Sequence, residues 1–125
     1  MSGSAKPRIL MVEDESLLLE VITADLEDAG FAVFQAATAE ITLNILTAEA
    51  SVDILFTDIR LPGLMDGWQL AEAARTLRPD LPVIYATGFS QTPPRLIAGS
   101  VFFTKPYRAA TLIKAIESFA VGPNA

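Results

Sequence analysis

The sequence contains no cysteine and no histidine, and it has nine basic residues against fifteen acidic ones. Without cysteine there are no disulfides or thiolate metal sites, so a reducing cytoplasm is the simplest compartment to expect. Without histidine there is no imidazole for zinc binding or base chemistry. The lysines and arginines are scattered and the net charge is −6, which argues against a nucleic-acid partner. Proteins and small ions remain as expected partners.

The sequence also lacks any apolar run long enough to span a membrane, and its short polar N-terminus resembles no signal peptide. We therefore expect neither export nor a membrane anchor. Phosphate-binding loops of the GxxxxGK and GxGxxG types are absent, which argues against a nucleotide-dependent function. The 125 residues, 51% of them hydrophobic, suffice for one domain with a sizeable core. We expect that domain at 8–121, between a flexible N-terminus at 1–7 and a polar tail at 122–125.

Apolar strand patterns alternate with helical patterns along the chain. Helical spacing of apolar residues follows four of the strands, with Thr38 as a cap for the second helix and Gly30 as the end of the first. This alternation predicts a doubly wound α/β fold, in which a five-stranded parallel sheet carries helices on both faces. The expected strands are 9–12, 31–36, 51–57, 81–86 and 101–104.

The segment 88–100 fits this alternation poorly. Pro93 and Pro94 leave room for only about one helical turn after them. Only Leu96 and Ile97 could anchor this turn by burial. The free energy gained by burying two side chains does not offset the conformational entropy lost when roughly a dozen residues become ordered. We expect a shortened or disordered fourth helix that orders when a ligand or a partner binds nearby.

Four polar residues, Asp14, Asp58, Thr87 and Lys105, stand where apolar strand patterns end. Because the carboxyl ends of parallel strands share one edge, we expect them to meet in the crevice where open α/β sheets bind ligands. Each has a plain structural alternative, as a helix cap, a loop acid or a solvated charge. The coincidence of four favours a functional site.

The residue types at this edge suit phosphoryl chemistry. Glu13 and Asp14 beside Asp58, with a backbone carbonyl, would form a hard oxygen site of the kind that Mg²⁺ prefers. An aspartate beside such an ion can attack a phosphoryl group and form an aspartyl phosphate, while the metal and a lysine neutralise the oxygens. Thr87 would hydrogen-bond one of those oxygens.

Short motifs fall at the ends of four expected strands and at the start of the third helix. Together they resemble the receiver domain of two-component response regulators, over about residues 8–120. The motifs are Met11-Val12-Glu13-Asp14-Glu15, Thr57-Asp58-Ile59-Arg60-Leu61-Pro62-Gly63, Asp66-Gly67, Ala86-Thr87-Gly88 and Thr104-Lys105-Pro106.

The resemblance implies a flavodoxin-like receiver with strands in the order 2-1-3-4-5, counted along the chain. Asp58 would accept a phosphoryl group from a histidine kinase or a histidine phosphotransfer protein. Glu13, Asp14, Asp58 and the backbone carbonyl of Arg60 would hold Mg²⁺ or Mn²⁺. The protein would be a bacterial, cytoplasmic signalling phosphoprotein and not an enzyme, beyond metal-dependent self-phosphorylation and slow self-dephosphorylation.

The same resemblance makes Thr87 the switch hydroxyl and Lys105 the lysine that contacts the phosphate, followed by a cis bond to Pro106. Phe102 occupies the aromatic switch position, three residues before the lysine, so the switch would have no phenolic hydroxyl; a buried core phenylalanine is the alternative. The run from Tyr85 to Phe89 resembles the Phe-Ala-Thr-Gly subgroup, which includes many alphaproteobacterial single-domain regulators, with tyrosine replacing the first phenylalanine.

One further departure lies in the loop between Pro62 and Asp66, which has one residue more than the commonest receivers carry. This lengthens the loop beside the phosphorylation site and leaves the acceptor and the lysine intact. Arg60 and Phe89, each two residues beyond a site residue, are bulky enough to obstruct an attacking water. We therefore expect slow hydrolysis of the phosphorylated form.

Three alternatives stay open. A flavodoxin-like enzyme or small-molecule binder could use the same crevice, although it would lack a phosphate loop. A structural interaction module with scattered acids is the weakest reading. The chain shows no effector domain after its last expected helix, so we expect a stand-alone regulator that acts through protein contacts, or a receiver excised from a hybrid kinase.

Overall fold

The computed structural model describes residues 7–48, 51–88 and 99–121. Within these ranges the five strands form one parallel sheet in the order β2-β1-β3-β4-β5, which confirms the predicted fold class and strand order. No helix in these ranges has the length and apolar character needed to cross a membrane. Along the chain the elements are β1 Arg8–Val12, α1 Ser16–Asp28, β2 Ala32–Ala36, α2 Ala39–Ala48, β3 Ile54–Asp58, α3 Gly67–Leu77, β4 Val83–Thr87, β5 Val101–Thr104 and α4 Ala109–Val121.

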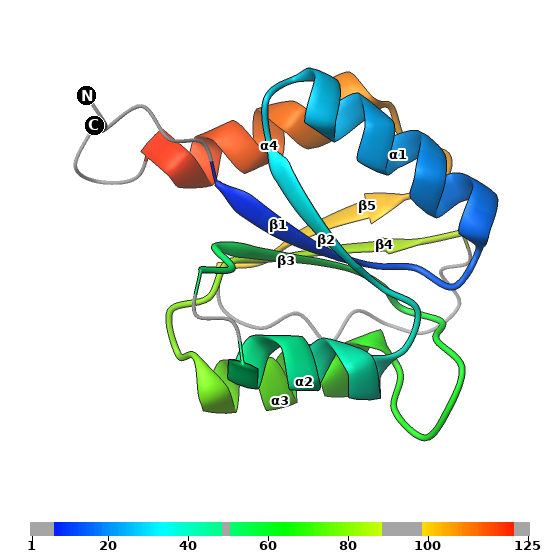
Figure 1. The fold of residues 1–125 in the computed structure, drawn as a ribbon, viewed down its shortest axis with the longest axis vertical. Helices are drawn as coiled ribbons and strands as arrows, with labels where there is room; N and C mark the ends of the chain where they lie inside the picture. Colours follow the sequence, from blue (N-terminus) through cyan, green and yellow to red (C-terminus); the bar gives the residue numbers. More distant parts are fainter. Residues whose placement is uncertain (1–6, 49–50, 89–98, 122–125) are drawn as a thin grey trace.

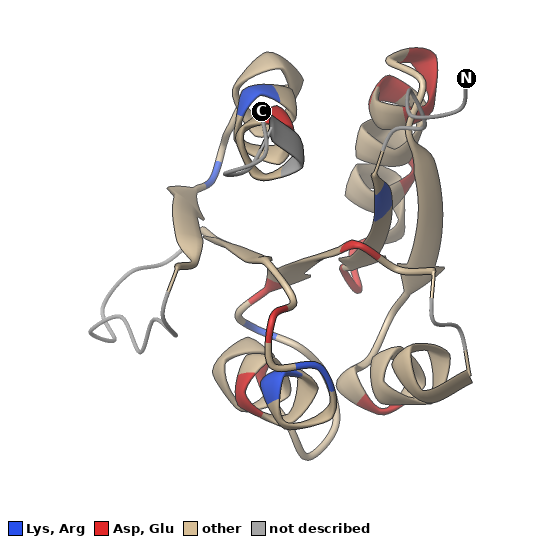
Figure 2. Cartoon of the chain, turned by 90° about the vertical axis from the view of Figure 1, so that its left-hand side faces the viewer, with Lys and Arg blue, Asp and Glu red and all other residues tan. Residues whose placement is uncertain are grey.

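Helices cover both faces of the sheet (Figure 1), with α1 and α4 on one side and α2 and α3 on the other. Alternate residues of the central strands pack on opposite sides, so the sheet separates two hydrophobic cores. Leu10, Leu55 and Tyr85 belong to the core under α2 and α3, whereas Met11 and Phe56 belong to the core under α1 and α4. Charged residues lie mainly on helices and loops (Figure 2).

The helix boundaries follow the local sequence. Thr38 Oγ1 accepts a hydrogen bond of 3.1 Å from the amide of Ile41 at the start of α2, as its predicted capping role requires. Gly30 has a φ of 99° just after α1, a conformation that suits glycine. Asp66 caps α3 in a reciprocal capping box with Gln69.

The strands differ from the predictions at their ends. β3 runs from Ile54 to Asp58 and β4 from Val83 to Thr87, each starting two or three residues later and ending one residue later than expected. Val52 is buried although it precedes the hydrogen-bonded ladder, because burial and strand pairing are separate properties. At the other end, Asp58 still pairs with Ala86, so a polar residue ends the ladder.

Some predictions fall outside the described residues. Residues 89–98 carry most of the expected shortened fourth helix, and 1–6 and 122–125 carry the expected flexible termini, so these remain predictions. Leu77, the last residue of α3, is 50% exposed.

Candidate functional site

The carboxyl ends of β1, β3 and β5 bring Glu13, Asp58 and Lys105 together. Glu13 and Asp58 each lie two residues beyond a buried residue of the core under α1 and α4, namely Met11 and Phe56. The period of two along a strand therefore directs both carboxylates to the same side of the sheet. The backbone holds the register, since the amide of Glu13 donates to the Ala36 carbonyl at 3.0 Å.

Lys105 joins the two buried carboxylates. Its Nζ lies 2.9 Å from Glu13 Oε1 and 3.0 Å from Asp58 Oδ2. Glu13 is 3% exposed and Asp58 is 8% exposed, so these ion pairs are largely shielded from solvent. Backbone amides hold the other carboxylate oxygens: Glu15 donates to Glu13 Oε2 at 3.0 Å, and Arg60 donates to Asp58 Oδ1 at 3.3 Å.

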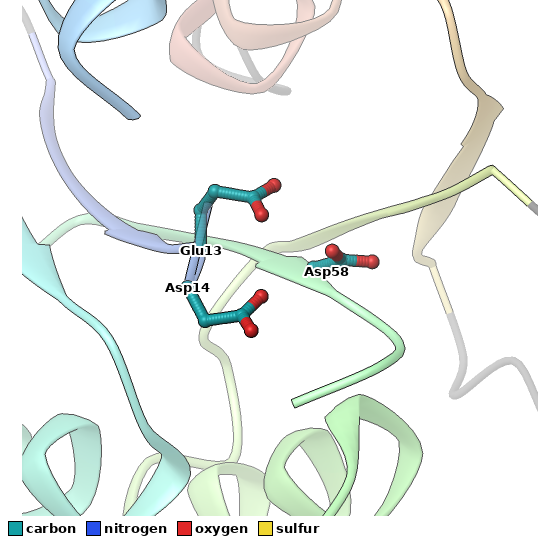
Figure 3. Close-up of side chains that lie close together, drawn as sticks. All are labelled: Glu13, Asp14 and Asp58. Carbon is teal, nitrogen blue, oxygen red and sulfur yellow. The ribbon is translucent and has the colours of Figure 1, made fainter. Parts of the chain in front are cut away.

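Asp14 completes a cluster of three carboxylates. One oxygen from each of Glu13, Asp14 and Asp58 lies within 4.8 Å of the others. Glu13 and Asp14 point to opposite sides of the end of β1, and Asp58 lies at the end of β3 (Figure 3). Asp14 is exposed, and it does not cap α1, whose N-cap residue is Glu15. A buried pair of oxygens with an exposed third fits Mg²⁺, which takes a few carboxylates and keeps several waters.

The electrostatics match this arrangement. Burial raises the pKa of Glu13, and the nearby Asp58 charge adds to this, against the hydrogen bonds from Lys105 and Glu15. Burial acts to lower the pKa of Lys105, but its hydrogen bonds with Glu13 and Asp58 and their negative charges raise that pKa overall. Lys105 is therefore a cation at neutral pH, where it faces more negative charge than it can balance alone.

Thr87 lies on β4 and Phe102 on β5, the two strands that follow β3 in the sheet. Thr87 is the last residue of β4 and is 3% exposed, and its carbonyl accepts a 2.8 Å hydrogen bond from the amide of Lys105. Phe102 is partly buried against the core under α2 and α3, where its ring stacks on Trp68. The Lys105-Pro106 bond is cis, as expected.

Sequence reasoning missed two features of the site. Gly67 entered the sequence analysis only as part of the Asp66-Gly67 motif, yet a Cβ added to it would lie 2.2 Å from the carbonyl oxygen of Asp58. Tyr107 was not singled out, although burial, followed by the charges of Glu13 and Asp58, raises its pKa. Its position two residues beyond Lys105 was the available indication. The structure therefore adds a packing constraint and an aromatic neighbour to the predicted residues.

Comparison with known families gives one match that covers most of the chain. A family model described as "Response regulator receiver domain" matches residues 9–117. Among curated proteins, the C4-dicarboxylate transport transcriptional regulatory protein DctD of Rhizobium meliloti (strain 1021) is 36% identical over 115 residues, which is 89% of this chain and 25% of that protein. The chain spans between 25% and 49% of the length of the first curated relatives it matches.

Solved structures agree with this match. A response regulator receiver protein from Sinorhizobium medicae WSM419 superposes with a TM-score of 0.86 at 31% identity, over 94% of this chain and 96% of that one. The receiver domain of the hybrid histidine kinase CckA superposes with a TM-score of 0.78 at 31% identity, over 89% of this chain and 96% of that one. The similarity thus extends both to a response regulator receiver protein and to the receiver domain of a hybrid histidine kinase.

Proposed function

The chain belongs to the response regulator receiver domain family of two-component signalling, and from that premise we propose that Asp58 is its phosphoacceptor. The observation that carries the assignment is the position of Lys105 Nζ, 3.0 Å from Asp58 Oδ2 and 2.9 Å from Glu13 Oε1. A cation at this place balances the acceptor carboxylate before reaction and lies next to the phosphoryl oxygens afterwards. Receivers are signalling domains and not classical enzymes, and we infer the same for this chain.

The proposed reaction transfers a phosphoryl group from a phosphohistidine of a kinase or phosphotransfer protein. A carboxylate oxygen of Asp58 forms the new P–O bond while the P–N bond to the donor imidazole breaks. Lys105 offsets the charge on the transferred oxygens, and the Thr87 hydroxyl donates to one of them. Glu13, Asp14 and Asp58, with the Arg60 carbonyl, would hold Mg²⁺ or Mn²⁺, which when bound would supply further positive charge at those oxygens.

Several sequence predictions accompany this proposal. We place the receiver unit at 8–121, and we keep the Phe-Ala-Thr-Gly subgroup and the switch role of Phe102 as hypotheses. A cytoplasmic location and a protein as the downstream partner remain predictions of the sequence. The relatives include proteins named as transcriptional regulators, so the expected absence of a nucleic-acid partner also remains a prediction.

A phosphoryl mimic gives a direct test of the site. Beryllofluoride with Mg²⁺ is expected to shift the amide NMR signals of Asp58, Thr87 and Lys105 more than those of residues at the opposite edge of the sheet. Asp53, at the amino end of β3, is the internal control. Signals at the three site residues that did not move would favour the alternative of a flavodoxin-like small-molecule binder.

Mg²⁺ is expected to stabilise the protein against heat. Three carboxylates lie close together and Lys105 pairs with two of them, so a divalent cation relieves their repulsion and binds the folded state alone. At a concentration ten times the dissociation constant, this linkage is worth about 1.4 kcal/mol, or a rise in Tm of about 5 °C. Thermal unfolding followed by circular dichroism with and without the ion measures it.

Two variants locate the effect. Asp14→Ala should lose most of the Mg²⁺-dependent rise in Tm, because it removes the exposed ligand of the cluster. Asp28→Ala removes another exposed acid, from the far end of α1, and should keep the full rise. If the wild-type Tm did not respond to millimolar Mg²⁺, the carboxylate cluster would not be a metal site.

The phosphorylated form is expected to hydrolyse slowly. Arg60 is exposed beside the acceptor, where its side chain can cover the path of an in-line water; Phe89, the second predicted obstruction, lies outside the described residues. Combining Arg60→Asn with Phe89→Ala should speed dephosphorylation about tenfold. The decay of intact phosphorylated mass after removal of the phosphodonor measures this, and an unchanged decay rate would show that neither side chain shields the phosphoryl group.

A further inference from the structure

The single tryptophan of the chain is buried next to Gly67, the residue that packs against the backbone of the proposed acceptor. Trp68 is the second residue of α3 and is 3% exposed. The start of α3 is fixed to the end of β3, because the amide of Gly67 donates to the Ile59 carbonyl at 2.7 Å. Because Gly67 lies so close to the Asp58 carbonyl, the start of α3 cannot shift relative to the end of β3 without a steric clash. Trp68 therefore has a fixed position relative to Asp58.

From this position the indole contacts the next two strands of the sheet. Its ring centroid lies 4.7 Å from that of Tyr85 on β4, and 6.1 Å from that of Phe102 on β5 with an interplanar angle of 7°. Tyr85 and Phe102 are direct partners across the two strands. The three rings thus join α3, β4 and β5 under the carboxyl edge of the sheet.

The contact with β4 leads to the proposed switch hydroxyl. Thr87 lies two residues beyond Tyr85 on the same strand, so both side chains belong to the face that Trp68 covers. Tyr85 is completely buried, which means that it cannot move without moving its packing partners. The position of the end of β4 therefore depends, through Tyr85, on the position of Trp68.

The contacts of the indole with the described residues are ring contacts with Tyr85 and Phe102. Its Nε1 is buried and has no hydrogen-bond partner in the part of the chain that the structure describes. The stacking therefore depends on the apolar surface and the shape of the ring. A phenyl ring can reproduce part of this contact, whereas an aliphatic side chain cannot stack.

We propose that Trp68 is a positioning residue of the phosphoryl-accepting site, which places the Thr87 hydroxyl relative to Asp58 through its stack with Tyr85 and Phe102. The inference rests on the proposed function of Asp58. Catalytic groups that are misplaced by about 1 Å lose rate steeply, so disturbing the stack should slow phosphorylation even though Trp68 touches no reacting atom.

The test is a mutant cycle on the initial rate of phosphorylation by phosphoramidate with Mg²⁺, followed by intact-protein mass spectrometry well below each variant's Tm. Trp68→Leu is expected to slow phosphorylation about tenfold, and Trp68→Phe to restore it to within about threefold of wild type. In a Thr87→Ala background, Trp68→Leu should cost no more than a further factor of about two, because the group that it positions is gone. If Trp68→Leu does not fold, Trp68→Met gives the same cycle.

Phe31→Leu is the matched control, since Phe31 is also 3% exposed but packs in the core under α1 and α4. It should lower the Tm and leave the rate unchanged. The inference is overturned if Trp68→Leu keeps the wild-type rate, if Phe31→Leu slows the reaction as much, or if the full effect of Trp68→Leu persists without the Thr87 hydroxyl. A wild-type protein that took up no phosphoryl group would overturn the proposed function, and this inference with it.

Discussion

Asp58→Asn is expected to abolish covalent phosphorylation of this protein. The substitution keeps the size of a side chain that is 8% exposed, so the local packing survives, but a neutral amide is not a nucleophile toward phosphorus. The amide also lacks the charge that Lys105 Nζ meets at 3.0 Å. Incubation with acetyl phosphate and Mg²⁺, followed by intact mass spectrometry, should show one base-labile phosphoryl group on the wild type and none on the variant.

Asp80→Asn provides the matched control for this experiment. Asp80 is exposed in the loop between α3 and β4, at the opposite edge of the sheet, and its variant should label as fully as the wild type. A labelled Asp58→Asn protein would overturn the assignment of the acceptor. In that case peptide mapping would identify the residue that carries the phosphoryl group.

Gly67→Ala is expected to destabilise the fold severely. The added Cβ would lie 2.2 Å from the Asp58 carbonyl oxygen and 2.7 Å from the Ile59 Cα, and both of these are backbone atoms. Alanine favours a helix over glycine by about 1 kcal/mol, but relieving the overlap requires moving α3 or the end of β3, at a cost of about 3 kcal/mol or more. The net free energy of unfolding should fall by about 2 kcal/mol or more, which lowers the Tm by about 8 °C or more.

The same displacement should impair phosphorylation, because the atom that must move belongs to the acceptor residue itself. Gly88→Ala is the control: among the described residues its Cβ would meet only the side chain of Lys105, at 3.8 Å, which is an ordinary contact. Its stability should stay within about 1 kcal/mol of wild type. Denaturant unfolding of both variants measures the difference, and a Gly67→Ala protein as stable as Gly88→Ala would contradict the packing described for α3.

The amino-acid sequence by itself determined the order of the elements and the residue types at the carboxyl edge of the sheet. Periodicity reports burial, so an apolar run that stops at Asp58 or Thr87 marks a strand end, and parallel strands must end at one edge. Capping was equally local, as Thr38 shows: its side chain bonds an amide three residues away. The strand starts were less accurate, because Val52 is buried without being paired.

Only the tertiary structure decided which of these groups touch. The ion pairs of Lys105 reach Glu13 across 92 positions and Asp58 across 47, and their lengths depend on how β1, β3 and β5 are placed in the sheet. The close packing of Gly67 against Asp58, and the ring contacts of Trp68, likewise depend on where α3 packs against the sheet. A pattern of residue types predicts which side of an element is buried, but ångström-scale contacts between elements arise from the packing of all their side chains together.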